Sequence, residues 1–95
     1  MGMFKKEDEN YVYELVSKNI TRIREMRGLT KKQLAEKTYF NSHFIYNIEN
    51  TNYYQTFSVA TLVLLAKGLD VDIREFFVED EELEKRENSQ NKELE

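Results

Sequence analysis

The sequence contains no cysteine and no proline, and it has only three glycines among its 95 residues. Without cysteine the chain forms no disulfide, offers no thiolate nucleophile and cannot hold zinc through sulfur. Without proline, and with so few glycines, long helices are not interrupted, and no run of alternating apolar and polar residues indicates a sheet. A high share of Leu, Glu, Lys and Ile completes a composition that predicts an all-α fold.

A long apolar run is also missing. The N-terminal stretch MGMFKKEDEN has no apolar signal core, and no segment approaches the roughly 20 apolar residues that cross a bilayer. Gly2 is a poor site for myristoylation, because Lys6 stands where Ser or Thr is expected. We therefore expect a cytoplasmic protein with no membrane partner, built as one small domain around one core.

The sequence also lacks catalytic residues in any recognisable pattern. His43 is the single histidine, and without a second His or any Cys it is not expected to bind metal or to transfer protons. The acids Glu14, Glu25 and Glu36 are scattered surface residues rather than a catalytic pair. Nothing resembles a nucleophile with its base, a phosphate-binding glycine loop or a metal cage. We expect no enzyme, no cofactor and no small-molecule ligand.

Charge, in contrast, is abundant and unevenly distributed. Residues 18–47 hold seven Lys or Arg against two Glu, a net charge of +5, whereas residues 70–95 hold eleven acids against four bases, a net charge of −7. The overall charge of −4 therefore conceals a basic segment. Such a segment is typical of a surface that meets nucleic acid, although surface helices also carry lysines for solubility alone.

Two short helices with a break between them are predicted over residues 29–49. Thr30 and Gln33 form a capping box for the first helix, since the hydroxyl accepts one free N–H and the glutamine returns to another. The segment Tyr39-Phe40-Asn41 then interrupts the apolar pattern. Asn41 is a good N-cap for a second helix that begins at Ser42.

The second of these helices has one apolar face and one uncharged polar face. At about 100° per residue, Ile45 and Ile48 share the face that we expect to be buried. A helix that is merely solvated usually carries charge on its outward face, and this one carries none. The opposite face consists of Ser42, His43, Tyr46 and Asn47.

The flanking segments predict further helices. One helix runs over residues 10–27, with an apolar stripe of Val12, Val16, Ile20 and Ile23, and ends at Gly28 as the C′ residue. Ser58 caps an almost wholly apolar helix over residues 59–69, and Asp72 with Glu75 opens a fifth helix. We expect a flexible arm over residues 1–9, a domain over residues 10–78 and an acidic tail over residues 79–95 that is frayed or disordered. The tail residues Leu83 and Leu94 are too few for a coiled coil.

Residues 20–77, about two-thirds of the chain, resemble the helix-turn-helix domain of the phage-repressor (Cro/repressor, or XRE) family. The resemblance rests on the order and spacing of Ile20…Arg24…Gly28-Leu29-Thr30, Leu34-Ala35-Glu36, Ile45-x-x-Ile48-Glu49, Leu65-Ala66-Lys67-Gly68-Leu69-Asp70-Val71 and Phe76-Phe77. It implies a compact fold of five helices in which the second and third form the DNA-binding unit. It also implies that Ser42, His43, Tyr46 and Asn47 face base edges and that the start of helix two touches phosphate.

These observations lead to a set of expected sites. We expect phosphate contacts from Lys31, Lys32, Asn41, Asn50 and Asn52. Arg24 and Glu49 are expected to form a buried ion pair, as the family pairs these positions. Part of the apolar set after helix four is expected to form a two-fold interface, because so small a chain cannot cover all of it. That set is Leu69, Val71, Ile73, Phe76 and Phe77.

The expected function is a sequence-specific regulator, a repressor that binds double-stranded DNA as a homodimer on a palindromic operator. Its setting stays open among phage or mobile-element repressors, restriction–modification controllers and antitoxins. The alternative is a protein-binding adaptor that retains the fold, although an adaptor has no need of the +5 segment.

Two departures from the family pattern bear on the turn and the loop. Tyr39 stands where glycine is usual, and a positive φ there would introduce strain of about 1–3 kcal/mol. The loop after Glu49 is longer than is common and holds Tyr53, Tyr54 and Phe57, which we expect to pack rather than to stack on bases.

Overall fold

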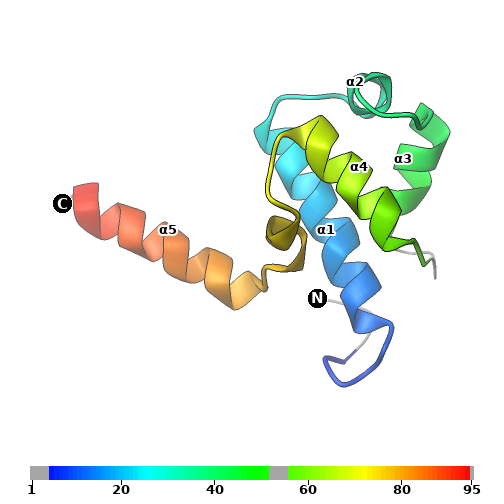
Figure 1. Cartoon of the computed structure of the whole chain (residues 1–95). Coiled ribbons are helices and arrows are strands. Elements are labelled where there is room, and N and C mark those ends of the chain that lie inside the picture. The colour runs from blue at the N-terminus through cyan, green and yellow to red at the C-terminus, as the bar shows by residue number, and fades with distance from the viewer. Residues whose placement is uncertain (1–4, 52–55, 95) are drawn as a thin grey trace.

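The computed structural model describes residues 5–51 and 56–94. They form five α-helices and one short 3-10 helix, joined by turns and loops. No strand occurs in these residues, so the predicted all-α fold is confirmed. Helices α1 and α4 form the centre, α2 and α3 cover one end, and α5 extends away from the rest (Figure 1). The elements are α1 (Tyr11–Met26), α2 (Lys31–Glu36), α3 (Ser42–Glu49), α4 (Val59–Leu69), η1 (Ile73–Phe77) and α5 (Asp80–Leu94).

The core consists of aliphatic side chains from the first four helices and one aromatic ring from η1. Ile20, Leu34, Ile45 and Leu65 are fully buried, and the ring of Phe76 is buried beside them. The predicted stripe of α1 is only partly right, because Val12, close to the start of the helix, is exposed. Conversely, Glu14 is buried although its charge suggested a surface position.

Capping groups predicted from the sequence set the helix boundaries. The hydroxyl of Thr30 accepts the N–H of Gln33 at 3.0 Å, and the Gln33 side chain accepts the N–H of Thr30 at 2.8 Å, so the capping box is confirmed. The carboxamide oxygen of Asn41 accepts the N–H of Phe44 at 2.8 Å and begins α3. Ser58 likewise begins α4 by accepting the N–H of Thr61. These short helices therefore start where their side chains satisfy otherwise unpaired donors.

Two glycines are required by the geometry around them. Gly28 has a φ of 69°, and its N–H donates to the carbonyl of Glu25 while the next N–H donates to the carbonyl of Arg24, which together end α1 in a Schellman motif. At Gly68 a Cβ atom would lie 2.7 Å from the side chain of Thr38. The absence of a side chain at this position lets α4 pack closely against the end of α2.

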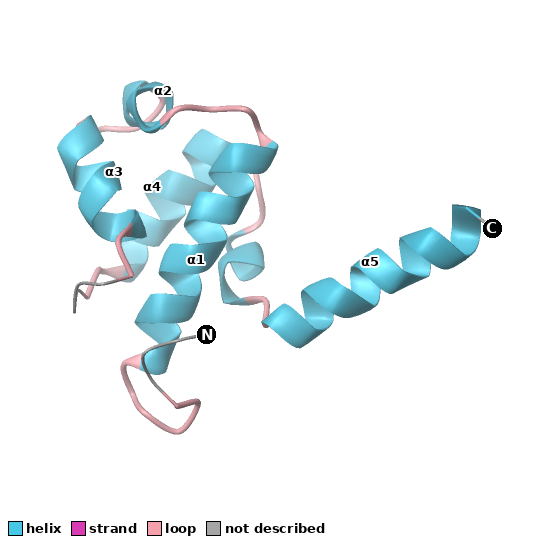
Figure 2. Ribbon diagram, turned by 180° about the vertical axis from the view of Figure 1, so that it is seen from behind, coloured by secondary structure: helices cyan, strands magenta, loops and turns pink. Residues whose placement is uncertain are grey.

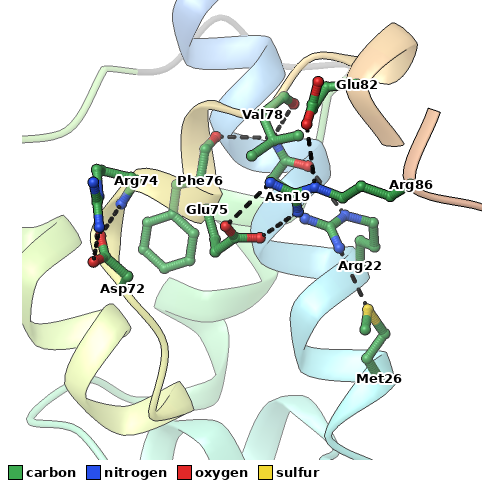
Figure 3. Close-up of polar contacts among 10 residues, drawn as sticks. All are labelled: Asn19, Arg22, Met26, Asp72, Arg74, Glu75, Phe76, Val78, Glu82 and Arg86. Carbon is green, nitrogen blue, oxygen red and sulfur yellow. Dashed lines mark hydrogen bonds and ion pairs between the residues drawn. The ribbon is translucent and has the colours of Figure 1, made fainter. Parts of the chain in front are cut away.

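The expected fifth helix at residues 72–77 is instead the 3-10 helix η1, and Asp72 and Glu75 do not form a capping box. The carboxylate of Asp72 accepts the backbone and side-chain N–H groups of Arg74, at 2.9 Å and 3.0 Å. Asn19 on α1 binds the end of η1, since its amide nitrogen donates to the carbonyls of Phe76 and Val78 at 2.9 Å and 2.8 Å (Figure 3). An α-helix continuing through Phe76 would need that carbonyl for its own ladder.

The acidic tail, expected to be frayed or disordered, forms the helix α5. Its first turn holds acidic side chains, which suit the positive end of a helix dipole. The first half of α5 is tied to the domain by exposed ionic contacts, and the rest extends away (Figure 2). The contacts join Lys6 to Glu81 at 3.0 Å, Lys18 to Asp80 at 3.2 Å and Arg86 to Glu75 at 2.9 Å. Lys6 belongs to the predicted N-terminal arm, of which residues 5–9 are described and turn back toward this helix.

Candidate nucleic-acid interface

Helix α3 places its two faces as the sequence pattern predicts. Ile45 and Ile48 are buried, with exposed fractions of 0% and 1%, and they fix the helix on the core. Ser42, His43 and Tyr46 are exposed, and Asn47 is partly exposed. An uncharged set of hydroxyl, imidazole, phenol and amide groups therefore faces away from the domain. Such a set can both donate and accept hydrogen bonds.

A buried ion pair holds α3 against α1. Nε of Arg24 donates to Oε2 of Glu49 at 2.7 Å, and Nη2 donates to Oε1 at 3.0 Å, a bidentate arrangement. Nη1 of Arg24 also donates to the carbonyl of Leu29 at 2.6 Å. The hydrogen bond to Glu49 raises the pKa of Arg24 above its ordinary value. One guanidinium thus joins α1, the start of the α2 segment and the end of α3.

The turn between α2 and α3 accommodates Tyr39 without left-handed backbone. Asp70 is the one non-glycine residue with a positive φ in the described part of the chain, so the strain considered for Tyr39 does not arise. Tyr39 is 91% exposed and makes the turn with its side chain in solvent. Inside the turn the rings of Phe40 and Phe44 stack, with centroids 4.3 Å apart and planes inclined by 24°. The aromatic stack and the hydroxyl of Thr38, which accepts the N–H of Phe40 at 3.3 Å, were not identified from the sequence.

The lysines at the start of α2 differ from one another. Lys32 is exposed. Lys31 is partly buried, and its Nζ lies 5.1 Å from the centroid of the Tyr46 ring, close enough for a cation–π interaction. Both Lys31 and Tyr46 border an open hollow of about 330 Å³, whose other lining includes Arg24, Glu49 and Asn50. The structure therefore brings an expected phosphate contact and an expected base contact together, a pairing that sequence spacing alone did not indicate.

Two of the asparagines expected to contact phosphate, Asn41 and Asn50, stand at the two ends of α3. Asn41 is exposed at the N-terminus of α3, where its carboxamide oxygen serves as the cap. Asn50 is partly buried directly after α3. Asn52, Tyr53 and Tyr54 lie outside the described residues. Phe57 packs as expected: its ring meets that of Tyr13 on α1 edge to face, with centroids 5.4 Å apart.

The apolar set expected at a subunit interface is divided by the structure. Leu69 and Phe76 have exposed fractions of 1% and 0%, so they belong to the core of the single chain and cannot also face a second copy. Val71 and Ile73 pack partly buried against that core. Phe77 is 43% exposed and is the most accessible of the five. The sequence alone could not make this division, since apolar residues next to a small core look alike in sequence whether they fill it or extend it.

In the described part of the chain, no three or more His, Cys, Asp or Glu side chains come together as metal ligands. None of the helices there combines the length and the apolar character needed to cross a membrane.

Two short helices joined by a tight turn, with the second helix presenting a polar outer face, define a helix-turn-helix protein. A helix-turn-helix domain family matches residues 17–82. The chain therefore belongs to the helix-turn-helix family of DNA-binding transcription regulators, of the XRE type that the resemblance indicated.

The chain is similar in sequence and fold to a solved restriction–modification controller. It is similar to the wild-type restriction–modification controller protein C.Esp1396I, with 32% identity and a TM-score of 0.64 over 73% of this chain and 87% of that one. A single-residue mutant of the same controller gives 33% identity and a TM-score of 0.63 over 70% and 87%. A hypothetical transcription factor NHTF from Neisseria gives a TM-score of 0.70 over 90% and 95%, but at 15% identity it shows the fold alone. A search of curated proteins found no match.

Proposed function

We propose that the protein is a sequence-specific regulator that reads the major groove of double-stranded DNA with α3. The observation that carries this proposal is the exposed, uncharged face of α3, set beside lysines at the start of α2. Base edges are read by neutral donors and acceptors, whereas phosphate is bound by positive charge. Asn47 is suited to a bidentate pair with adenine, and His43 and Tyr46 to base edges or thymine methyl groups.

The phosphate contacts would come from the edges of this face. Lys31 and Lys32 supply charge, and Asn41 supplies the amide NH₂ group of its cap together with the N-terminus of α3. Asn50 and Asn52 follow α3 and would touch the backbone beyond it. Ser42 lies at the start of α3, where the same turn of helix faces both backbone and bases.

A homodimer on a palindromic operator, acting as a repressor, completes the proposal. One domain of this size offers a modest DNA interface, so useful affinity requires two copies. Among the three settings considered, that of a restriction–modification controller is favoured, because about a third of the residues match such a protein over most of its length. The exposed side chain of Phe77, together with the partly buried Val71 and Ile73, would contribute to the two-fold contact.

Selection from a random duplex library with the purified full chain tests the proposal. Enrichment of a palindrome with half-sites about one helical turn apart is expected, as two copies of α3 must enter successive major grooves. The matched control is the Tyr46→Ala/Asn47→Ala double variant, which keeps the net charge and should bind DNA without enriching that palindrome. If the wild-type chain enriches no sequence, the reading role of α3 is wrong. The protein-binding adaptor would then be favoured.

A further inference from the structure

The ammonium of Lys31 lies over an aromatic ring and not beside a carboxylate. Its ammonium lies 5.1 Å from the centroid of the Tyr46 ring, across the space between the start of α2 and the middle of α3. In the described part of the chain, neither the ammonium of Lys31 nor the hydroxyl of Tyr46 takes part in a hydrogen bond or ion pair. Among the described residues, the cation–π contact with the Tyr46 ring is therefore the interaction that positions the Lys31 ammonium.

The carboxylates nearby do not compete for the ammonium. Glu49 borders the same hollow, but both of its oxygens accept from Arg24, at 2.7 Å and 3.0 Å. Glu25 also borders the hollow and forms no ion pair with Lys31. With Glu49 already neutralised, the electron-rich face of the tyrosine is the favourable place for the positive charge.

We propose that Lys31 is a specificity-determining residue, because its ammonium holds the Tyr46 ring in the orientation in which α3 presents it to a base pair. This inference rests on the proposed function, since it assigns a second residue to the same reading face. Tyr46 is 51% exposed, so packing alone leaves its ring room to change rotamer. The lysine supplies the restraint that packing does not.

The position of Lys31 makes the restraint effective. It is the first residue of α2, and the capping box between Thr30 and Gln33 fixes the backbone at this point. An ammonium group has three N–H donors, and a contact with a ring face leaves donors for a phosphate oxygen. Lys31 can therefore contact the backbone and orient a base-reading side chain at the same time, whereas Lys32 can do only the first.

The contact itself is tested on the free protein, without DNA. The side-chain Hε protons of Lys31 should show an upfield NMR shift from the ring current of Tyr46, and that shift should vanish in the Tyr46→Leu variant. Lys32 serves as the internal control and should show no shift in either protein. Unshifted Lys31 Hε protons in the wild-type chain would overturn the inference at this first step.

The role in specificity is tested with the duplex obtained by selection and a set of its single-base-pair substitutions. Selectivity is the ratio of the Kd values for substituted and preferred duplexes. Lys31→Ala should lower selectivity about two- to fivefold, as expected for loss of an exposed cation–π contact. The loss should fall on the base pairs that Tyr46→Leu also affects, and it should disappear when Lys31→Ala is made in the Tyr46→Leu background.

Two further variants separate orientation from charge. Lys31→Arg keeps a cation that stacks on aromatic rings and should restore selectivity. Lys32→Ala removes the same charge one position away and should weaken all duplexes equally. A Lys31→Ala variant that behaves like Lys32→Ala would overturn the inference. If no duplex is preferred at all, the proposed function fails and the specificity role fails with it, while the NMR result still decides the contact.

Discussion

Arg24 and Glu49 form the most buried ion pair in the described part of the chain, with side-chain exposures of 10% and 4%. Removing one partner leaves the other charge buried without compensation. We expect Arg24→Ala and Glu49→Ala each to lower the free energy of unfolding by about 3 kcal/mol, and the double variant to lose far less than the sum. Urea denaturation of the four proteins measures the coupling.

Lys18 and Asp80 provide the matched comparison, because their ion pair has side-chain exposures of 39% and 66%. A solvent-exposed pair contributes at most about 1 kcal/mol. Lys18→Ala should therefore change the unfolding free energy little. Small and independent losses for Arg24→Ala and Glu49→Ala would show that the buried pair does not anchor α3.

The hydrogen bond of Tyr11 predicts how the stability of the fold depends on pH. Its hydroxyl donates to Oε2 of Glu79 at 2.6 Å, and this hydrogen bond raises the pKa of Tyr11 from 10.0 to about 12. The folded pKa lies above the unfolded value, so the contact stabilises the fold fully below pH 10 and is lost as pH rises toward 12. Absorbance at about 295 nm should show a late phase in the tyrosine titration, and Tyr11→Phe should remove that late phase. An unchanged titration curve in this variant would place the hydroxyl away from Glu79.

At the scale of elements, the proposed DNA contacts divide between the charged side chains at the start of α2 and the hydrogen-bonding groups of α3. Lys32 is exposed and should contact phosphate, so Lys32→Ala should weaken binding to every duplex and reduce the salt slope by about one unit. His43 and Asn47 present neutral groups. Alanine at either position should weaken the preferred duplex by about 1–3 kcal/mol with little effect on a scrambled one. Titrations of both duplexes at two salt concentrations distinguish the two classes, and equal losses on both duplexes for Asn47→Ala would contradict base reading.

The end of η1 accepts two hydrogen bonds from a single amide of α1. Asn19 is 3% exposed, and its amide nitrogen donates to the carbonyls of both Phe76 and Val78. Asn19→Ala leaves these acceptors without their donor, so we expect a loss of about 1–3 kcal/mol in unfolding free energy. Hydrogen exchange should also quicken in α5, which begins just beyond Val78. Asn10→Ala is the control, because the Asn10 side chain makes no capping bond to α1; an equal effect of the two variants would refute the role of Asn19.

At the scale of the whole molecule, the exposed apolar side chains predict association of two copies. Val63 and Phe77 are 38% and 43% exposed. Val71 and Ile73 are partly buried and line a hollow together with Val63. We expect sedimentation at tens of micromolar, roughly the range in which a specific interface is populated, to show a dimer. Phe77→Ser should favour the monomer. Tyr39→Ser, which removes an exposed ring in the α2–α3 turn, should leave the dimer intact, and a wild-type monomer both free and on DNA would remove the two-fold contact.

Local chemistry along the chain was sufficient to predict much of this molecule. The capping residues Thr30, Asn41 and Ser58 act on backbone donors within a few residues, so their effect can be read without a tertiary structure. The same holds for Gly28, whose positive φ ends α1. Helical periodicity separated the buried Ile45 and Ile48 from the polar face of α3, because a helix fixes the direction of each side chain from its position alone.

Only the tertiary structure decided which apolar residues the core would take and which polar groups would meet. Asn19 and Phe76 are 57 residues apart, and their hydrogen bond lies at the end of η1, where the sequence predicted a fifth helix. Leu69 and Phe76 were assigned to an interface and lie in the core, since pattern gives the apolar face of an element but not its partner. The meeting of Lys31 with Tyr46 belongs to the same class: it depends on how α2 packs against α3, and no local rule relates the two positions.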